Sequence, residues 1–105
     1  MDFNLDEQEK MFQTLAKEFA AKFVNPRAAE IDQSGQFPLD LVKEMGNQGY
    51  MGLPYPVKYG GSGAGYLSGV LVLEQICQAS MTVAAILHIN TVAEEAIFRF
   101  GNDEQ

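Results

Sequence analysis

Residues 66–100 read YLSGVLVLEQICQASMTVAAILHINTVAEEAIFRF, and this stretch decides the fold. It is long, rich in helix formers and free of proline, and its one internal break falls at Ser80. The pattern predicts one helix over about 66–78 and a second over about 80–100. Gly101 follows directly and is expected to take the C-cap position of the second helix.

These two predicted helices are unusually poor in charge. Over residues 59–93 the only charged side chain is Glu74, which should face water or pair with a base. A helix that is apolar nearly all round is normally buried on most of its sides. The shorter N-terminal helices cannot cover both, so we infer that another domain or another copy of the chain does.

The N-terminal part predicts an amphipathic helix that begins near Asn4 or Asp6, since either side chain can cap free N–H groups. A period of about 3.6 residues puts four large apolar side chains on one face: Phe12, Leu15, Phe19 and Phe23. Asn25-Pro26 should then kink or restart the helix, because proline disfavours a helical residue before it.

A second short helix is expected to open at Phe37-Pro38, and Gly46 and Gly49 should weaken and end it. Its predicted buried face consists of Leu39, Val42 and Met45. Residues 50–65 hold two prolines and five glycines, which predicts a loop. No segment alternates as a strand does, so we expect an all-α bundle of about four to six helices in one domain, residues 1–105.

The composition excludes several classes of protein. The net charge is −7 and the seven basic residues are scattered, so we expect no nucleic-acid binding. A single cysteine rules out an intrachain disulfide, and the acidic start resembles neither a signal nor a transit peptide. The longest uncharged run, residues 75–93, is too polar to predict a membrane span. These features predict a cytoplasmic protein.

The glycine-rich segment GGSGAG, residues 60–65, invites comparison with phosphate-binding loops but departs from them. A dinucleotide fingerprint would need glycine where Tyr66 stands, a Walker loop would need lysine there, and no predicted strand precedes the segment. We interpret it as a flexible connection before a helix. The alternative is that the edge of a cofactor or substrate lies along it.

Isolated polar residues give no catalytic constellation. His88 is the only histidine and lacks ligands at helical spacing, so no metal site is predicted, and we expect a neutral, hydrogen-bonded histidine in the core or in a pocket. Cys77 is expected to be an inert core thiol and Glu94-Glu95 a solvated patch. Four methionines are expected to fill the core: Met11, Met45, Met51 and Met81.

The order of short segments along the chain carries a resemblance to a known family. These segments are NPRAAEID (25–32), GQFP (35–38), MGNQGYMGL (45–53), PYPVKYGGSG (54–63), LEQI (73–76) and FGNDEQ (100–105). Together, and in this order, they resemble the N-terminal domain of acyl-CoA dehydrogenases from end to end. The most specific are the P-x-x-Y-G-G-x-G loop, the glutamate that follows on its helix, and the closing FGNDEQ.

The resemblance implies an orthogonal or up-and-down helical domain, followed in the family by a middle β-domain and a C-terminal four-helix bundle that are absent from this chain. It also implies FAD, an acyl-CoA substrate, and a glutamate that removes the α-proton while hydride passes from the β-carbon to the flavin. Electrons would leave through an electron-transfer flavoprotein, and the enzyme would be a homotetramer or a dimer.

The resemblance also implies a site on this chain. In the family the helix equivalent to residues 80–100 lines the acyl-chain cavity, so Ala84, His88 and Val92 would face the chain, with His88 near the blind end. An imidazole there is a departure from several straight-chain enzymes and would shorten or polarise the pocket. The catalytic and cofactor-binding residues of the family lie beyond Gln105, so none is assigned here and this chain alone is expected to be inactive.

Two alternatives stay open. Acyl-CoA oxidases, flavin monooxygenases and nitroalkane oxidases share the same N-terminal domain, and the residues that separate them lie further along the chain. A free-standing helical binding module is the second alternative. It would bury residues 66–93 against a partner or by self-association, so the isolated chain should oligomerise or expose apolar surface.

Overall fold

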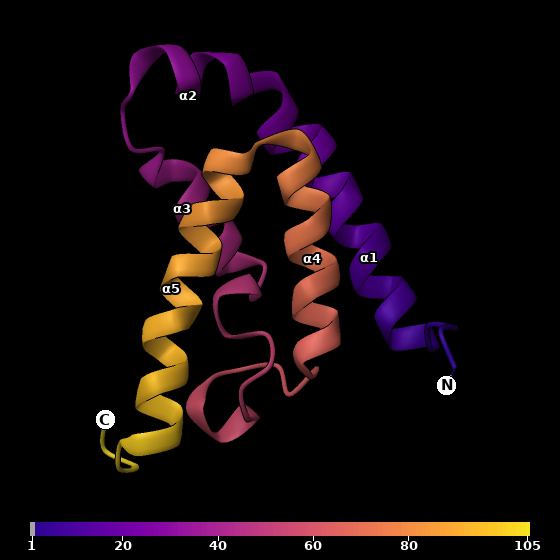
Figure 1. Ribbon diagram of the computed structural model, residues 1–105, viewed down its shortest axis with the longest axis vertical. Helices are drawn as coiled ribbons and strands as arrows, with labels where there is room; N and C mark the ends of the chain where they lie inside the picture. The colour runs from indigo at the N-terminus through magenta and orange to yellow at the C-terminus, as the bar shows by residue number, and fades with distance from the viewer. Residues whose placement is uncertain (1) are drawn as a thin grey trace.

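The computed structural model describes residues 2–105, and helices alone make up its regular structure over that range. The five α-helices are α1 (Glu7–Phe19), α2 (Ala28–Ser34), α3 (Leu39–Asn47), α4 (Tyr66–Ala79) and α5 (Met81–Phe100). Figure 1 shows α4 and α5 side by side and antiparallel, with α1 along the other flank of α4. The prediction of an all-α domain with about four to six helices is confirmed.

Helix α1 begins where its capping residues dictate. The Asp6 carboxylate accepts from the Glu9 N–H (2.7 Å), and the Glu9 carboxylate accepts from the Asp6 N–H (2.9 Å). This reciprocal capping box satisfies two N–H groups that the first turn leaves free. Of the two predicted starts, Asp6 is therefore the one used. The buried stripe runs through Ala16 and Phe19, whereas Leu15, one position or about 100° away, is about half exposed.

The break predicted at Asn25-Pro26 is present. The end of α1 widens into a π-helical turn (Ala20–Val24) and tightens into a 3-10 turn (Asn25–Arg27) before α2 restarts the helix. Proline cannot donate the next helical hydrogen bond, so the chain changes pitch on either side of it. Gly35, with φ 65°, then ends α2.

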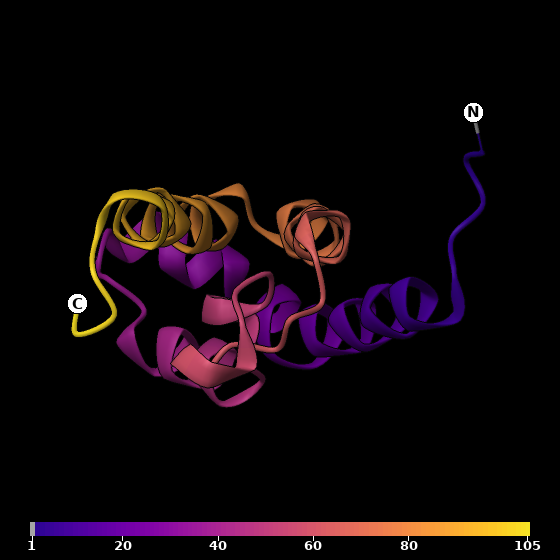
Figure 2. The same ribbon diagram turned by 90° about the horizontal axis from the view of Figure 1, so that it is seen from below.

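Helix α3 and the segment after it differ in detail from the prediction. The helix buries Leu41 and Met45, and Leu39 is exposed, because the buried face is rotated from the one predicted. Residues 48–65 are not entirely irregular, since they contain 3-10 turns at Tyr50–Gly52 and Val57–Tyr59. Seen end on, α4 and α5 form one layer, and the segment after α3 packs in a second layer beneath them (Figure 2).

The core lies between these layers and is built from the inner faces of every α-helix. Its most deeply buried members are Ala16, Val24, Met45, Leu53, Val72, Ile76 and Val83. Ser80 alone separates α4 from α5, and its hydroxyl oxygen accepts from the Val83 N–H (3.2 Å), which starts α5. Gly101 takes the expected C-cap position with extended backbone, and a Cβ there would lie 2.5 Å from the Ile97 carbonyl oxygen.

Several residues expected in the core lie on the surface. Cys77 is exposed because it is one position beyond Ile76, which fills the core side of α4. Met45 is buried, but Met11 is about half exposed and Met81 is 75% exposed. Met81 precedes the first inward position of α5. In an apolar helix, composition does not tell which side faces inward.

Helix α5 reaches the length and apolar character of a membrane-crossing helix, yet only 17% of its apolar window is buried. Its inner face, Val83, Ala84 and Leu87, packs into the core of the domain. One such helix is a weak indication of a membrane span, since core helices pass the same test. What distinguishes α5 is therefore the apolar surface it leaves uncovered.

Candidate functional site

A mostly apolar groove of about 410 Å³ runs between α4 and α5. We call it the α4–α5 groove. Its lining is contributed by α4 (Tyr66, Gly69, Val70, Val72 and Leu73), by α5 (Leu87, His88, Thr91, Val92 and Glu95) and by the segment after α3 (Tyr50, Leu53, Pro54 and Tyr55). Gly69 helps to open it, because no atom lies within 4 Å of where its Cβ would be.

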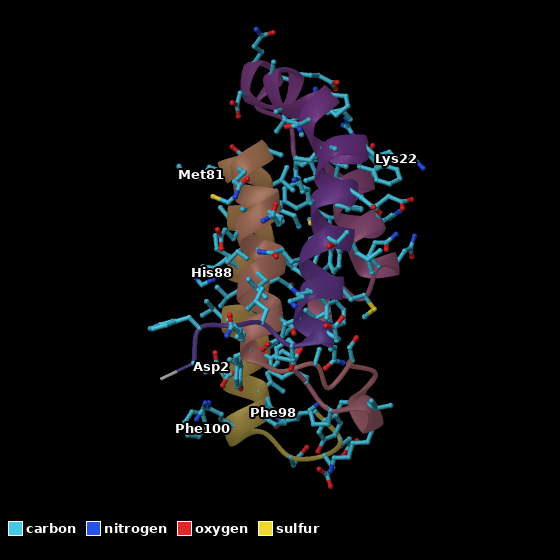
Figure 3. The ribbon with its side chains drawn as sticks, turned by 90° about the vertical axis from the view of Figure 1, so that its right-hand side faces the viewer. Asp2, Lys22, Met81, His88, Phe98 and Phe100 are labelled. Carbon is cyan, nitrogen blue, oxygen red and sulfur yellow. The ribbon has the colours of Figure 1, made fainter. Side chains whose placement is uncertain are left out.

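The three residues predicted to face an acyl chain do not lie together. His88 and Val92 both line the groove, one helical turn apart, whereas Ala84 is buried in the core and is absent from the lining. Figure 3 shows His88 projecting on the same side of the helix layer as Met81. His88 is exposed and lies in the groove lining, so of the two predicted placements the structure gives the pocket and not the core. The predicted hydrogen bond is absent, because its imidazole has no partner within residues 2–105.

The chain provides one polar cluster at the groove, which we call the Glu95 cluster: Tyr55, Tyr66, Glu95 and Arg99. The Tyr55 hydroxyl donates to Glu95 Oε2 (3.0 Å), and the Tyr66 hydroxyl lies 3.0 Å from both carboxylate oxygens. The Arg99 guanidinium donates to Oε1. The sequence predicted that Glu95 belongs to a solvated patch. That prediction is wrong, because three donors hold its carboxylate.

Charge and burial shift the pKa values within this cluster in opposite directions. The hydrogen bond from Arg99 is the main reason that the pKa of Glu95 is lowered, so the carboxylate stays charged. Burial is the main reason that the pKa of Tyr55 is raised, and the bond to Glu95 adds to it. The cluster therefore keeps the Tyr55 hydroxyl as a donor and the Glu95 carboxylate as an acceptor.

Glu94 lies on the other side of α5 and lines a second cavity of about 540 Å³ with Tyr55, Phe98 and residues 101–105. Asn90 donates to Glu94 Oε1, while Oε2 is buried without a partner. Burial raises the pKa of Glu94. The prediction of a solvated patch is wrong for this residue too, since Glu94 is only partly exposed and one of its carboxylate oxygens is buried.

The fold and this site can be set against known proteins. A family model described as "Acyl-CoA dehydrogenase, N-terminal domain" matches residues 6–105. The chain belongs to the acyl-CoA dehydrogenase family. The match covers every helix described above and confirms the resemblance seen in the sequence.

Individual relatives agree with this assignment. The chain is 38% identical, over its whole length, to a short-chain-specific acyl-CoA dehydrogenase of Clostridium acetobutylicum, of which it covers 28%. Over 95% of its length it is 41% identical to mitochondrial isovaleryl-CoA dehydrogenase of Pongo abelii, of which it covers 24%. The solved butyryl-CoA dehydrogenase of Megasphaera elsdenii superposes on 99% of the chain with a TM-score of 0.92 and 31% identity, and 28% of that protein is covered.

In this acyl-CoA dehydrogenase domain the glycine-rich loop is hydrogen-bonded to the segment that precedes it. The N–H groups of residues 60–64 all donate to carbonyls of the preceding segment, at 2.8–3.2 Å. A Cβ on Gly61 would lie 2.2 Å from the Tyr55 carbonyl oxygen, so the glycine is needed for close packing. The N–H groups of residues 60–64 are therefore already used and do not form a phosphate cradle. The prediction of a flexible connection is also corrected, since these bonds tie the loop to residues 52–57.

Sequence reasoning missed most of the groove in this acyl-CoA dehydrogenase domain. Thr91 and Glu95 lie three and seven positions after His88, on the same helical stripe, and that spacing could have revealed them. Tyr66 and Tyr55 carried no local signal, because they reach the site through the fold. Within residues 2–105, no group of three or more His, Cys, Asp or Glu side chains is arranged to hold a metal ion.

Proposed function

We propose that this domain supplies one wall of the acyl-chain site in an FAD-dependent acyl-CoA dehydrogenase, which removes hydrogen from Cα and Cβ of an acyl-CoA thioester. The observation that carries the proposal is the apolar α4–α5 groove with His88 and Val92 on its wall. The chain spans only 24–28% of the relatives' lengths, so the complete reaction belongs to a longer protein. An electron-transfer flavoprotein as acceptor and a cytoplasmic location are parts of the same proposal.

The residues of this chain would bind and orient the acyl chain and exclude water from it. Each buried methylene contributes about 0.8 kcal/mol, so an apolar lining favours a hydrocarbon chain over water. His88 would make its own end of the groove more polar than the rest of the lining. Thr91 is compatible with an apolar ligand, because its hydroxyl already donates to the His88 carbonyl (2.6 Å).

FAD, when bound, would accept the hydride, but the residues of this chain do not fit it. In the loop that most resembles a phosphate site, the N–H groups of residues 60–64 are bonded to the preceding segment, and no strand precedes the loop within residues 2–105. The flavin site is therefore proposed to lie elsewhere in the longer protein. No step of the reaction is assigned to residues of this chain beyond binding the acyl group.

The test uses the longer protein that contains this domain, purified with FAD and kept free of oxygen. Adding butanoyl-CoA should bleach the oxidised flavin absorbance, because reduction accompanies dehydrogenation. The 105-residue chain, incubated with FAD and desalted, should retain no flavin band. If butanoyl-, 3-methylbutanoyl- and octanoyl-CoA all leave the flavin of the longer protein oxidised, the proposal is wrong.

A second candidate function rests on the uncovered outer face of α5, where Met81, Ile89 and Phe100 are exposed. A stand-alone interaction module would use this face to bind a partner or another copy. Sedimentation of the 105-residue chain, together with binding of a hydrophobic dye, separates the cases. A monomer that binds no dye would contradict the interaction module, whereas dye binding lost on Ile89→Lys would identify this face as the exposed one.

A further inference from the structure

Glu95 is the only acidic residue in the lining of the α4–α5 groove, and it joins three parts of the chain. It lies on α5, its tyrosine partners come from the first residue of α4 and from the segment after α3, and Arg99 lies one turn further along α5. The three donors occupy both oxygens of the carboxylate. An otherwise apolar groove can therefore include this charge, because it is already paired.

The Glu95 cluster lies at one end of the groove. Since α4 and α5 are antiparallel, Tyr66 faces the Glu95 end and Leu73 lies towards the His88 end. Glu95 is two turns from His88, which places the two residues roughly 10 Å apart along the helix. At the His88 end, no side-chain hydrogen bond joins the two helices within residues 2–105.

The Tyr66–Glu95 bond thus fixes the separation of the helices at one end, and the Tyr55–Glu95 bond fixes the segment beneath them. Tyr55 is only 8% exposed, and apart from Glu95 its hydroxyl meets only the Thr91 carbonyl oxygen, at 3.4 Å. Without Glu95 a buried donor would have one long contact left, which favours movement of the ring. The width of this end of the groove therefore depends on one carboxylate.

We propose that Glu95 is a positioning residue which, through Tyr55 and Tyr66, fixes the width of the α4–α5 groove and so selects straight over branched acyl chains. A branch adds width to an acyl group without adding length, so it is sensitive to the separation of the helices. The proposal rests on the proposed function, because it takes the occupant of the groove to be the acyl group.

The experiment measures kcat/KM of the longer FAD-containing protein for pentanoyl-CoA and for its branched isomer 3-methylbutanoyl-CoA. Glu95→Ala should raise the branched-to-straight ratio about tenfold, the range that one misplaced methyl group can produce. Tyr66→Phe, which removes one hydroxyl from a 53% exposed side chain, should raise it less. Glu95→Gln keeps one acceptor oxygen and should restore part of the original ratio.

Glu94→Gln is the matched control, since it removes the same charge one position away and outside the groove lining. The branched-to-straight ratio of kcat/KM in Glu94→Gln should equal that of the unsubstituted protein. A purely structural role for Glu95 would lower both kcat/KM values together and leave their ratio unchanged, which overturns the proposal. An equal change of the branched-to-straight ratio in Glu94→Gln would also overturn the proposal.

The two proposals can fail separately. If the unsubstituted protein oxidises neither thioester, the proposed function is wrong and this inference falls with it. If it oxidises them and the ratio is insensitive to Glu95, only this inference is wrong. If Glu95→Ala does not fold, Tyr66→Phe decides alone, because an exposed hydroxyl can be removed without leaving a cavity.

Discussion

The inner and outer faces of α5 carry the same kinds of side chain in opposite surroundings. Val83 and Leu87 are buried in the core, while Ile89 and Phe100, on the same helix, are 68% and 87% exposed. The contrast is weaker on helix α1, where acids and lysines share the outer side with Met11 and Leu15, each about half exposed. The difference teaches that α5 has a second, larger apolar face that residues 2–105 leave uncovered.

The largest effect should separate the two faces of α5 directly. Leu87→Ala removes buried methyl groups and leaves a cavity, so it should lower the free energy of unfolding by about 3 kcal/mol. Ile89→Ala, two positions away on the outer face, should change it by less than about 0.5 kcal/mol. Urea denaturation of the 105-residue chain, followed by circular dichroism, measures both. Equal losses would mean that the outer face is covered in solution.

A smaller effect tests the N-cap of α5, the helix that carries this inner face. Ser80→Ala removes the hydroxyl that caps α5 through the Val83 N–H, and should cost about 1 kcal/mol. Thr82→Ala is the matched control, because its hydroxyl meets only the exposed Asp32 carboxylate (3.2 Å). A loss for Thr82→Ala as large as that for Ser80→Ala would show that the cap contributes nothing special.

The smallest effects concern two adjacent acids in different surroundings. The folded-state pKa of Glu95 is lowered, so its contribution to stability is present above its ordinary pKa of 4.5 and is lost as the pH falls through the folded value. The pKa of Glu94 is raised by burial, so its ionisation destabilises the fold as the pH rises from 4.5 through the folded value. The two contributions therefore have opposite signs.

Substitution by glutamine should expose this difference. At neutral pH, Glu95→Gln should be less stable than the unsubstituted chain and Glu94→Gln more stable, and both differences should shrink below pH 4.5. Thermal unfolding between pH 3 and 8 measures them. The same sign for both variants at neutral pH would contradict the assigned surroundings.

Much of the fold could be predicted because it depends on local chemistry. The start of α1 at Asp6, the break at Asn25-Pro26 and the link at Ser80 all follow from side chains that act on their own backbone. The ends of α4 and α5 fell within one or two residues of the predicted ones. The inward faces could not be predicted as well, because neighbouring positions on an apolar helix differ only in direction, as Ile76 and Cys77 show.

The candidate site was less predictable, because its polar partners are distant in the sequence. Glu95 meets Tyr66 and Tyr55 across 29 and 40 positions, and nothing near Glu95 indicates that these hydroxyls will reach it. Family resemblance pointed to a helix that does line a groove, and two of the three residues it named are in that lining. Whether Ala84, His88 and Val92 contact an acyl chain stays a prediction.

The close approach of Gly61 to the Tyr55 carbonyl has a consequence for how this domain can diverge. A side chain at position 61 would collide with backbone, and an inserted residue would break the run of hydrogen bonds from residues 60–64. The segment that contributes Leu53, Pro54 and Tyr55 to the groove can therefore accept few mutations. New groove shapes should arise instead by exchange of side chains on α4 and α5, where Gly69 and Val92 have open space around them.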